Sequence, residues 1–294
     1  MERILNQIYL QLSNLPLEKL PYCLQGKTGI MLFLALYSEW KDHLHARSLA
    51  KKLLISIIKN TSHLQPLFFN GSWGVLWALQ YLKKQGILEN DQTISQFIQQ
   101  LRNMNYAAQI AMPIKLMPKD VLFSEGICTL YQWKDDNSLE RYIVEEHLIN
   151  LIDDCKRLLS LDYPNIYYPN YMPISLLHSI TWYLQKMVTL KLYPYHAEQL
   201  LKEITSTSSK YLNNDNVDSY ILGNLLSDSR NGLTHETKLN NCIDTIGKAG
   251  FYSILYNRSD LFNKLWKPVE INNEMPISVL CGIGLGILQT KMNR

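Results

Sequence analysis

Gly26-Lys27-Thr28-Gly29, followed by Ile30-Met31-Leu32-Phe33-Leu34, is the stretch that decides the fold, because its pattern returns along the chain. Gly71-Ser72-Trp73-Gly74 precedes the apolar residues 75–79, and Gly247-Lys248-Ala249-Gly250 precedes residues 251–255. A unit that recurs at intervals of tens of residues is typical of repeat architectures. The sequence therefore predicts stacked repeats, with any site on the loops that carry the glycines.

Four weaker copies of the unit extend the series to seven. They begin at Gly126, Ser175, Tyr220 and Val279, and the last one carries Gly282. Inner helices that crowd together need close backbone approach and unusual φ/ψ angles, which glycine permits because it has no Cβ. We therefore assign a structural role to one set of glycines: Gly26, Gly29, Gly71, Gly74, Gly126, Gly247, Gly250 and Gly282.

The rest of the chain reads as helix, because apolar residues recur at spacings of three and four. Residues 45–59, 139–159 and 196–211 are amphipathic, whereas the runs 30–36 and 75–82 are apolar nearly all round. Buried helices that alternate with amphipathic ones predict helical hairpins stacked side by side. Closing such a row into a ring leaves no exposed end. We expect an all-α fold, an α/α toroid of about seven hairpins in a single domain over residues 1–294.

Composition limits the classes of function. The apolar fraction is 47%, which suffices for a large core, and the formal net charge is only +3 with no dense Lys/Arg run, which argues against a nucleic-acid partner. No apolar run reaches the ~18 residues of a membrane span, and the first residues lack the apolar core of a signal peptide. The five cysteines are odd in number and scattered, as reduced thiols would be. These features predict a cytoplasmic protein without membrane insertion.

Seven such units in an all-helical chain resemble the lanthionine synthetase C-like family. Gly26-Lys27-Thr28-Gly29-Ile30, residues 70–75 and the ending Cys281-Gly282-Ile283-Gly284-Leu285 are close to its repeats. The resemblance implies an α/α toroid. For family members that act as cyclases, it implies one zinc ion, which activates a peptide cysteine thiol for addition to dehydroalanine or dehydrobutyrine.

The zinc ligands implied by the resemblance are replaced in this chain. The first family cysteine aligns with Asp218, and the family Cys-His pair aligns with Thr245 and Ile246. The position of the family's active-site histidine is Ile174. No cofactor is therefore expected. A relocated zinc site would draw on Cys23, Cys128 and Cys281, with His178, His235 and Cys242 as further candidates.

The leading functional hypothesis is a non-catalytic family member, a pseudoenzyme that binds a peptide or a modifying enzyme in ribosomal-peptide maturation. The alternative is an active zinc-dependent cyclase that forms lanthionine thioethers. The helix N-termini at the mouth of the toroid, with free N–H groups, are expected to favour anions or a peptide carboxylate. Aromatic side chains near the same loops are candidates for peptide contact: Trp73, Tyr131, Trp133, Trp182 and Tyr220.

A glycosidase is a further possibility, because such enzymes also use α/α toroids and need two carboxylates that flank a pocket. The candidate acids are Asp120 and Glu125 near the third loop, and Glu236 and Asp244 near the sixth.

Overall fold

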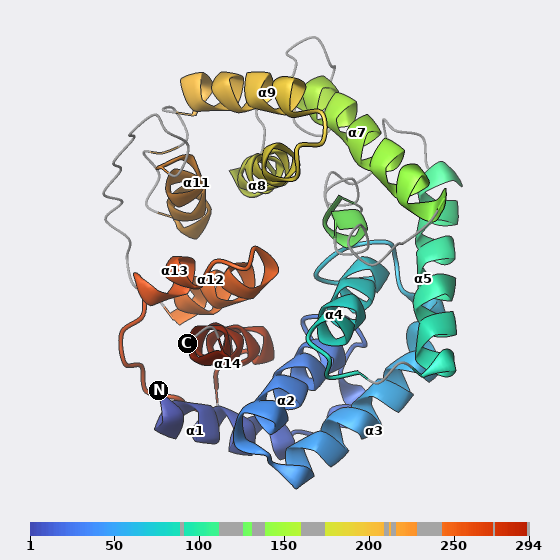
Figure 1. Ribbon diagram of the computed structural model, residues 1–294. Helices are drawn as coiled ribbons and strands as arrows, with labels where there is room; N and C mark the ends of the chain where they lie inside the picture. The colour runs from blue at the N-terminus through green and yellow to red at the C-terminus, as the bar shows by residue number, and fades with distance from the viewer. Residues whose placement is uncertain are drawn as a thin grey trace. The chain divides into compact units, whose positions relative to one another are not determined.

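The structure is a computed structural model of residues 1–294. It describes residues 1–88, 91–111, 126–130, 139–159, 174–208, 212, 216–227, 243–272 and 274–292. Tyr131, Trp133, His235, Cys242 and three of the candidate acids (Asp120, Glu125 and Glu236) lie outside these residues. The described chain forms helices joined by turns and loops, which confirms the all-α prediction (Figure 1).

The chain divides into two compact units, and each is described by itself. The first unit comprises Met1–Ala108 and Asn241–Arg294, and the second comprises Gln109–Asn240. The single domain over residues 1–294 stays a prediction.

The first unit holds most of the helices. They are α1 (Glu2–Ser13), α2 (Lys27–Lys41), α3 (Leu44–Asn60), α4 (Ser72–Lys84), α5 (Gln92–Ala111, whose last turn falls in the second unit), α12 (Ile243–Leu255), α13 (Ser259–Asn263) and α14 (Ile277–Met292). Short 3₁₀ turns cover Leu17–Lys19 and Thr61–His63.

Helix α14 connects the early and late parts of the sequence within the first unit. It packs against α12 and α13 on one side and against α2 and α1 on the other, as the neighbouring blue and red ribbons show (Figure 1). Helix α2 also contacts α3 and α4. The first and last repeats are thus neighbours, as a closed series of repeats requires.

The second unit holds α7 (Leu139–Leu159), α8 (Ile174–Leu190), α9 (Pro194–Thr207) and α11 (Val217–Ser227), together with a helical turn at residues 126–130. Helix α8 packs against α9 and α11, and α9 also contacts α7.

Burial separates the helices into the two predicted kinds. Helices α2, α4, α8, α11, α12 and α14 are buried nearly all round, whereas α3 and α9 bury one face only. The amphipathic helices predicted at 45–59 and 139–159 are confirmed as α3 and α7, and the one predicted at 196–211 forms α9 and ends at Thr207.

The glycine pairs do not all open their helices. Gly26 and Gly71 lie directly before α2 and α4, as predicted. Helix α12 begins at Ile243, so Gly247 and Gly250 lie inside it, and Gly282 lies inside α14. The prediction that Gly247 precedes its helix is wrong, because residues 243–246 already form the first turn of α12.

Candidate functional site: the loops before the inner helices

The glycine pairs of the first two repeats let a loop pass close over a helix start. A Cβ on Gly26 would lie 2.2 Å from Pro21 O, and a Cβ on Gly71 would lie 2.1 Å from Gln65 O. The second glycines meet the same limit, because a Cβ on Gly74 would lie 2.0 Å from Phe68 O. Any side chain at these positions would displace the backbone of the preceding loop.

These close loops also satisfy the helix N-termini. Lys27 N donates to Pro21 O over 2.8 Å, Thr28 N to Cys23 O over 3.2 Å, and Ser72 N to Gln65 O over 2.9 Å. Loop carbonyls therefore occupy N–H groups that a helix start normally leaves open. The expectation that helix N-termini offer free N–H groups to anions is wrong at the starts of α2 and α4, because loop carbonyl oxygens already accept hydrogen bonds from these groups.

Glycine φ angles have little part in this arrangement. Among the described glycines, only Gly86 has a positive φ, of 71°, and it lies in the turn after α4 rather than in a repeat motif. Glycine is required at the motif positions of the first two repeats because a Cβ would collide with the loop backbone.

In the second unit, the helix starts of α8 and α11 bring together a histidine and a carboxylate. His178 Nε2 lies 3.3 Å from Asp218 Oδ1, and the His178 side chain is fully buried whereas that of Asp218 is 20% exposed. A carboxylate accepts hydrogen bonds, so Nε2 carries the proton in this contact. On the other side of the ring, Nδ1 lies 3.4 Å from Ser179 Oγ, which donates to Ser175 O over 2.7 Å.

Asp218, His178 and Ser179 form a hydrogen-bonded array, and the order of these residues from the surface inward limits its chemistry. Its exposed end is the Asp218 carboxylate, and the serine at the other end, Ser179, is buried. A serine nucleophile must reach its substrate, so the array does not have the layout of a serine hydrolase. The exposed part of the array is the Asp218 carboxylate, which contacts a buried imidazole.

Sequence reasoning named both residues and missed their pairing. Asp218 was considered as a former zinc position and His178 as a candidate for a relocated site. Both lie within five residues of the starts of α8 and α11, which are neighbours in the second unit. His178 stands at the second glycine position of its repeat and Asp218 two residues before the first position of the next, so the adjacency of the two repeats was the available signal.

The candidate aromatic side chains in the described residues are buried. Trp73, Trp182 and Tyr220 expose 0%, 5% and 7% of their surface. The Trp73 ring packs edge-on against Tyr106, with centroids 5.7 Å apart, and Lys186 Nζ lies 5.8 Å from the centroid of Trp182. In this conformation the three rings contribute to packing, and their contact with a peptide stays a prediction.

Comparison with protein families identifies the first half of the repeat series. The model described as "Lanthionine synthetase C-like protein" matches residues 23–166, which include the repeats at Gly26, Gly71 and Gly126. Residues 23–166 of the chain are thus similar to the lanthionine synthetase C-like family. The all-helical architecture of the chain is consistent with the α/α toroid expected for that family. No match is found among curated proteins or among solved structures.

The similarity to the lanthionine synthetase C-like family raises the question of zinc, and the three positions that the resemblance aligns with zinc ligands lie outside the matched residues 23–166. A catalytic zinc site needs three protein ligands and one open position. At these three positions, Asp218 contacts His178, Thr245 offers a hydroxyl, and Ile246, which is 1% exposed, has no donor atom. The replacement of the zinc ligands stays a prediction.

The cysteines considered for a relocated site lie among core residues. Cys23 and Cys281 belong to the first unit and Cys128 to the second, and all three side chains are buried. Burial raises the pKa of the Cys23 and Cys281 thiols, which disfavours the thiolate that binds metal. Within the described ranges, no three side chains of His, Cys, Asp or Glu gather as metal ligands.

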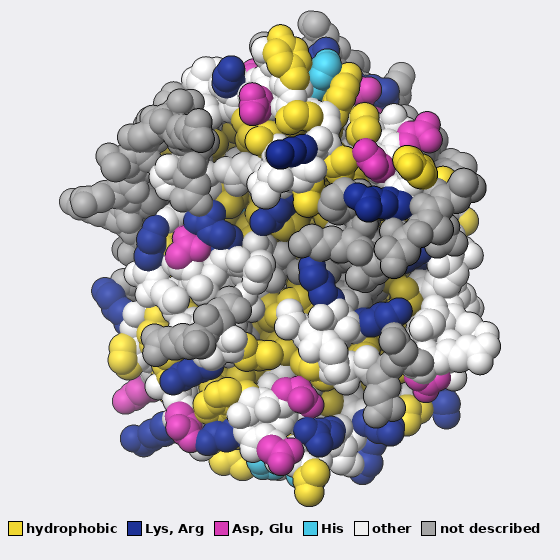
Figure 2. Space-filling model, in the orientation of Figure 1, with side chains coloured by type: hydrophobic (Ala, Val, Ile, Leu, Met, Phe, Trp, Pro, Cys, Tyr) yellow, Lys and Arg dark blue, Asp and Glu magenta, His cyan; other side chains and the backbone are white. Residues whose placement is uncertain are grey.

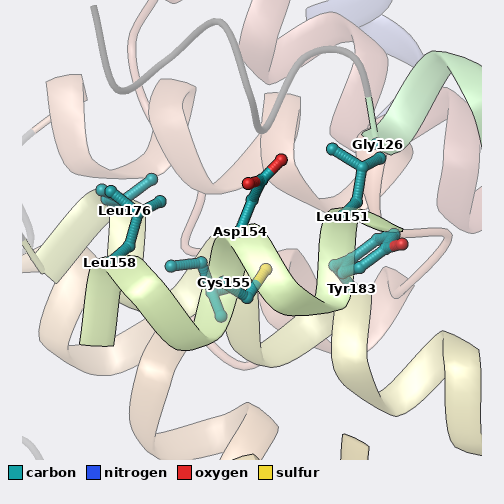
Figure 3. Close-up of a pocket in the computed structure, with 8 residues that line it drawn as sticks. Gly126, Leu151, Asp154, Cys155, Leu158, Leu176 and Tyr183 are labelled. Atoms are coloured by element: carbon teal, nitrogen blue, oxygen red, sulfur yellow. The ribbon is translucent and has the colours of Figure 1, made fainter. Parts of the chain in front are cut away.

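A small cavity lies beside the third repeat, which begins at Gly126. Leu151, Cys155 and Leu158 along α7, Tyr183 of α8 and Gly126 line it (Figure 3). Its volume of about 20 Å³ suits one water molecule rather than a substrate.

The molecular surface adds two observations. On the face shown in Figure 2, the Lys and Arg side chains that the structure describes are scattered among Asp and Glu rather than gathered into one basic patch. None of the described helices is both long and apolar enough to cross a bilayer.

Proposed function

We propose that this protein is a lanthionine synthetase C-like protein that binds a peptide, or an enzyme that modifies one, in a ribosomal-peptide maturation system, and that it does not perform zinc-dependent cyclisation. The proposal is supported by the residues at the three positions that the resemblance aligns with zinc ligands, which are Asp218, Thr245 and Ile246. Asp218 contacts a buried histidine, and the resemblance aligns the apolar Ile246 with a zinc ligand of the family. In this proposal, the helical scaffold is retained and the zinc chemistry is lost.

The Asp218 carboxylate suggests how a peptide would be recognised. A 20% exposed carboxylate fixed by His178 presents a localised negative charge at the start of α11. Such a group is suited to a peptide ammonium or guanidinium, because charge-assisted hydrogen bonds to a pre-oriented carboxylate are strong. In this proposal, a carboxylate that binds the peptide stands where a cyclase has a cysteine that binds zinc.

Elemental analysis of the protein, purified without chelators, tests the absence of zinc chemistry. We expect far less than one zinc ion per chain, and no thioether formation with a dehydrated peptide that contains cysteine. About one bound zinc per chain together with thioether product would overturn the proposal in favour of an active cyclase.

Peptide binding is tested separately. A precursor-type peptide with a basic segment should bind the wild type, and Asp218→Asn should weaken binding about tenfold, as loss of one charge-assisted hydrogen bond does. The matched control is Asp244→Asn, which removes an exposed acid from the first turn of another buried helix, α12. Equal affinities for wild type and Asp218→Asn would contradict the role of this carboxylate.

A further inference from the structure

A hollow separate from the glycine loops lies within the first unit. It has a volume of about 450 Å³ and is bounded by α2, α3, the end of α4 and the start of α5. Volumes of this size are typical of small-molecule sites. No residue discussed above as a candidate for peptide or metal binding lines it.

Small side chains create the space between the helices. Ala35 of α2 and Ala50 of α3 line the hollow, and their short side chains leave room that a larger side chain would fill. After α4, Gly86 takes a positive φ of 71° and turns the chain away toward α5. A Cβ on Gly86 would meet no atom within 4 Å, which shows that the surrounding space is open.

The floor of the hollow is apolar. Met31, Leu54 and Leu82 lie at its base and expose only 1%, 7% and 0% of their surface. The apolar surface that a ligand can reach belongs to partly exposed side chains, Ile87 of the turn after α4 and Ile94 of α5. An apolar chain placed here would exchange water for aliphatic contacts, which favours binding.

Two cationic side chains lie at the rim, and they differ in whether a carboxylate compensates their charge. Arg47 Nη2 lies 3.3 Å from Glu39 Oε1 and 3.3 Å from Asp42 Oδ1, so its charge is compensated. Asp91 Oδ1 accepts a hydrogen bond from Thr93 N over 2.7 Å at the start of α5. Lys51, one turn after Arg47, forms no ion pair with any residue that the structure describes.

We propose that this hollow binds a carboxylic acid with a single apolar chain of medium length. The acid's chain lies against the partly exposed Ile87 and Ile94, and its carboxylate pairs with Lys51 at the rim. The apolar side chains select the tail, and Lys51, the one cation among the described lining residues without an ion pair, selects the head group.

Calorimetric titration with n-decanoate, below its micelle concentration, tests the site. We expect saturable binding of one decanoate per chain and weaker binding of 1-decanol, because the alcohol lacks the charge. Lys51→Gln should weaken decanoate binding about tenfold. Lys52→Gln is the matched control, because Lys52 is the adjacent, exposed lysine of α3 and does not line the hollow. It should leave the affinity unchanged.

A second variant locates the tail. Ala50→Leu adds three carbon atoms to the wall and should abolish decanoate binding, with circular dichroism confirming that the helices remain. Absence of saturable decanoate binding to the wild type would overturn the proposal. So would equal binding of decanol, equal effects of the two lysine variants, or undiminished binding to a folded Ala50→Leu protein.

Discussion

At the scale of single residues, the Asp218–His178 contact combines burial with a hydrogen bond between two polar side chains. The imidazole is fully buried and donates to a partly exposed carboxylate. Removing one partner from such a pair leaves a buried polar group without its hydrogen bond, which costs more than the bond itself contributes. The pair is therefore expected to contribute to stability as well as to recognition.

Replacing His178 should lower stability. His178→Ala loses the hydrogen bond to Asp218 and leaves a cavity in the second unit, so the free energy of unfolding should fall by about 2–4 kcal/mol. Urea denaturation measures this change. A double-mutant cycle with Asp218→Asn should give a coupling of about 1 kcal/mol, and a coupling near zero would contradict the contact.

The buried thiols predict a dependence of stability on alkaline pH. Burial raises the pKa of Cys155 and of Cys281 above the value that a thiol has in the unfolded chain. Above the unfolded-state pKa near ~8.5, the unfolded chain releases protons that the folded chain retains. The stability contribution of these neutral thiols is thus present below that pH and declines as pH rises.

Urea denaturation between pH 7 and pH 9.5 measures this decline. The Cys281→Ala variant should show a smaller decrease than the wild type over the same range, because one of the titrating thiols is gone. Identical slopes for the two proteins would exclude a contribution from Cys281.

At the scale of elements, glycine sets the distance between α12 and α14. A Cβ on Gly250 would lie 2.0 Å from Gly282 O, and a Cβ on Gly282 would lie 2.0 Å from Gly247 O. Each helix thus presents a glycine to a backbone carbonyl of the other. Because backbone atoms cannot rotate away as a side chain can, the two helices must separate if either glycine is substituted.

Gly250→Ala should therefore destabilise the protein by about 2–3 kcal/mol. The matched variant is Gly126→Ala, whose Cβ would lie 3.3 Å from ring atoms of Tyr183 and should change stability by less than about 1 kcal/mol. Thermal unfolding of both variants compares them directly, and a Gly250→Ala protein as stable as Gly126→Ala would refute the close approach.

The sequence predicted elements better than their contacts. The 3.6-residue period was sufficient to identify α3 and α7, because one apolar face is a local property of the sequence. The close approach of Gly247 to Val279 of α14, where a Cβ would lie 2.9 Å from Val279 Cα, involves a residue far away in the sequence. The Asp218–His178 pair also depends on which helices are neighbours, and only the structure supplies that information.

At the scale of the whole molecule, α14 joins segments that the sequence separates widely. A Cβ on Gly284 of α14 would lie 2.5 Å from Cε2 of Phe33 in α2, so the Phe33 ring packs directly over this glycine. Cys281 also faces the start of α2, since its Sγ would lie 3.8 Å from a Cβ on Gly29. The first unit depends on this contact between early and late residues.

A compensating pair of substitutions tests the contact. Gly284→Ala should destabilise the protein by about 1–3 kcal/mol, because the added methyl group meets the Phe33 ring. Adding Phe33→Leu to this variant should restore part of the loss, with a coupling of about 0.5–3 kcal/mol in denaturant unfolding. Strictly additive effects would show that the two residues are not in contact.

The packing of Phe33 against Gly284 has a consequence for synthesis. About 250 residues separate the two positions, so at the rates of translation α2 precedes α14 by roughly 10–50 s. During that interval the face of α2 that α14 later covers has no native partner. The first unit therefore completes its core only after α14 has left the ribosome, and until then the cell must keep the apolar surface of α2 from aggregating.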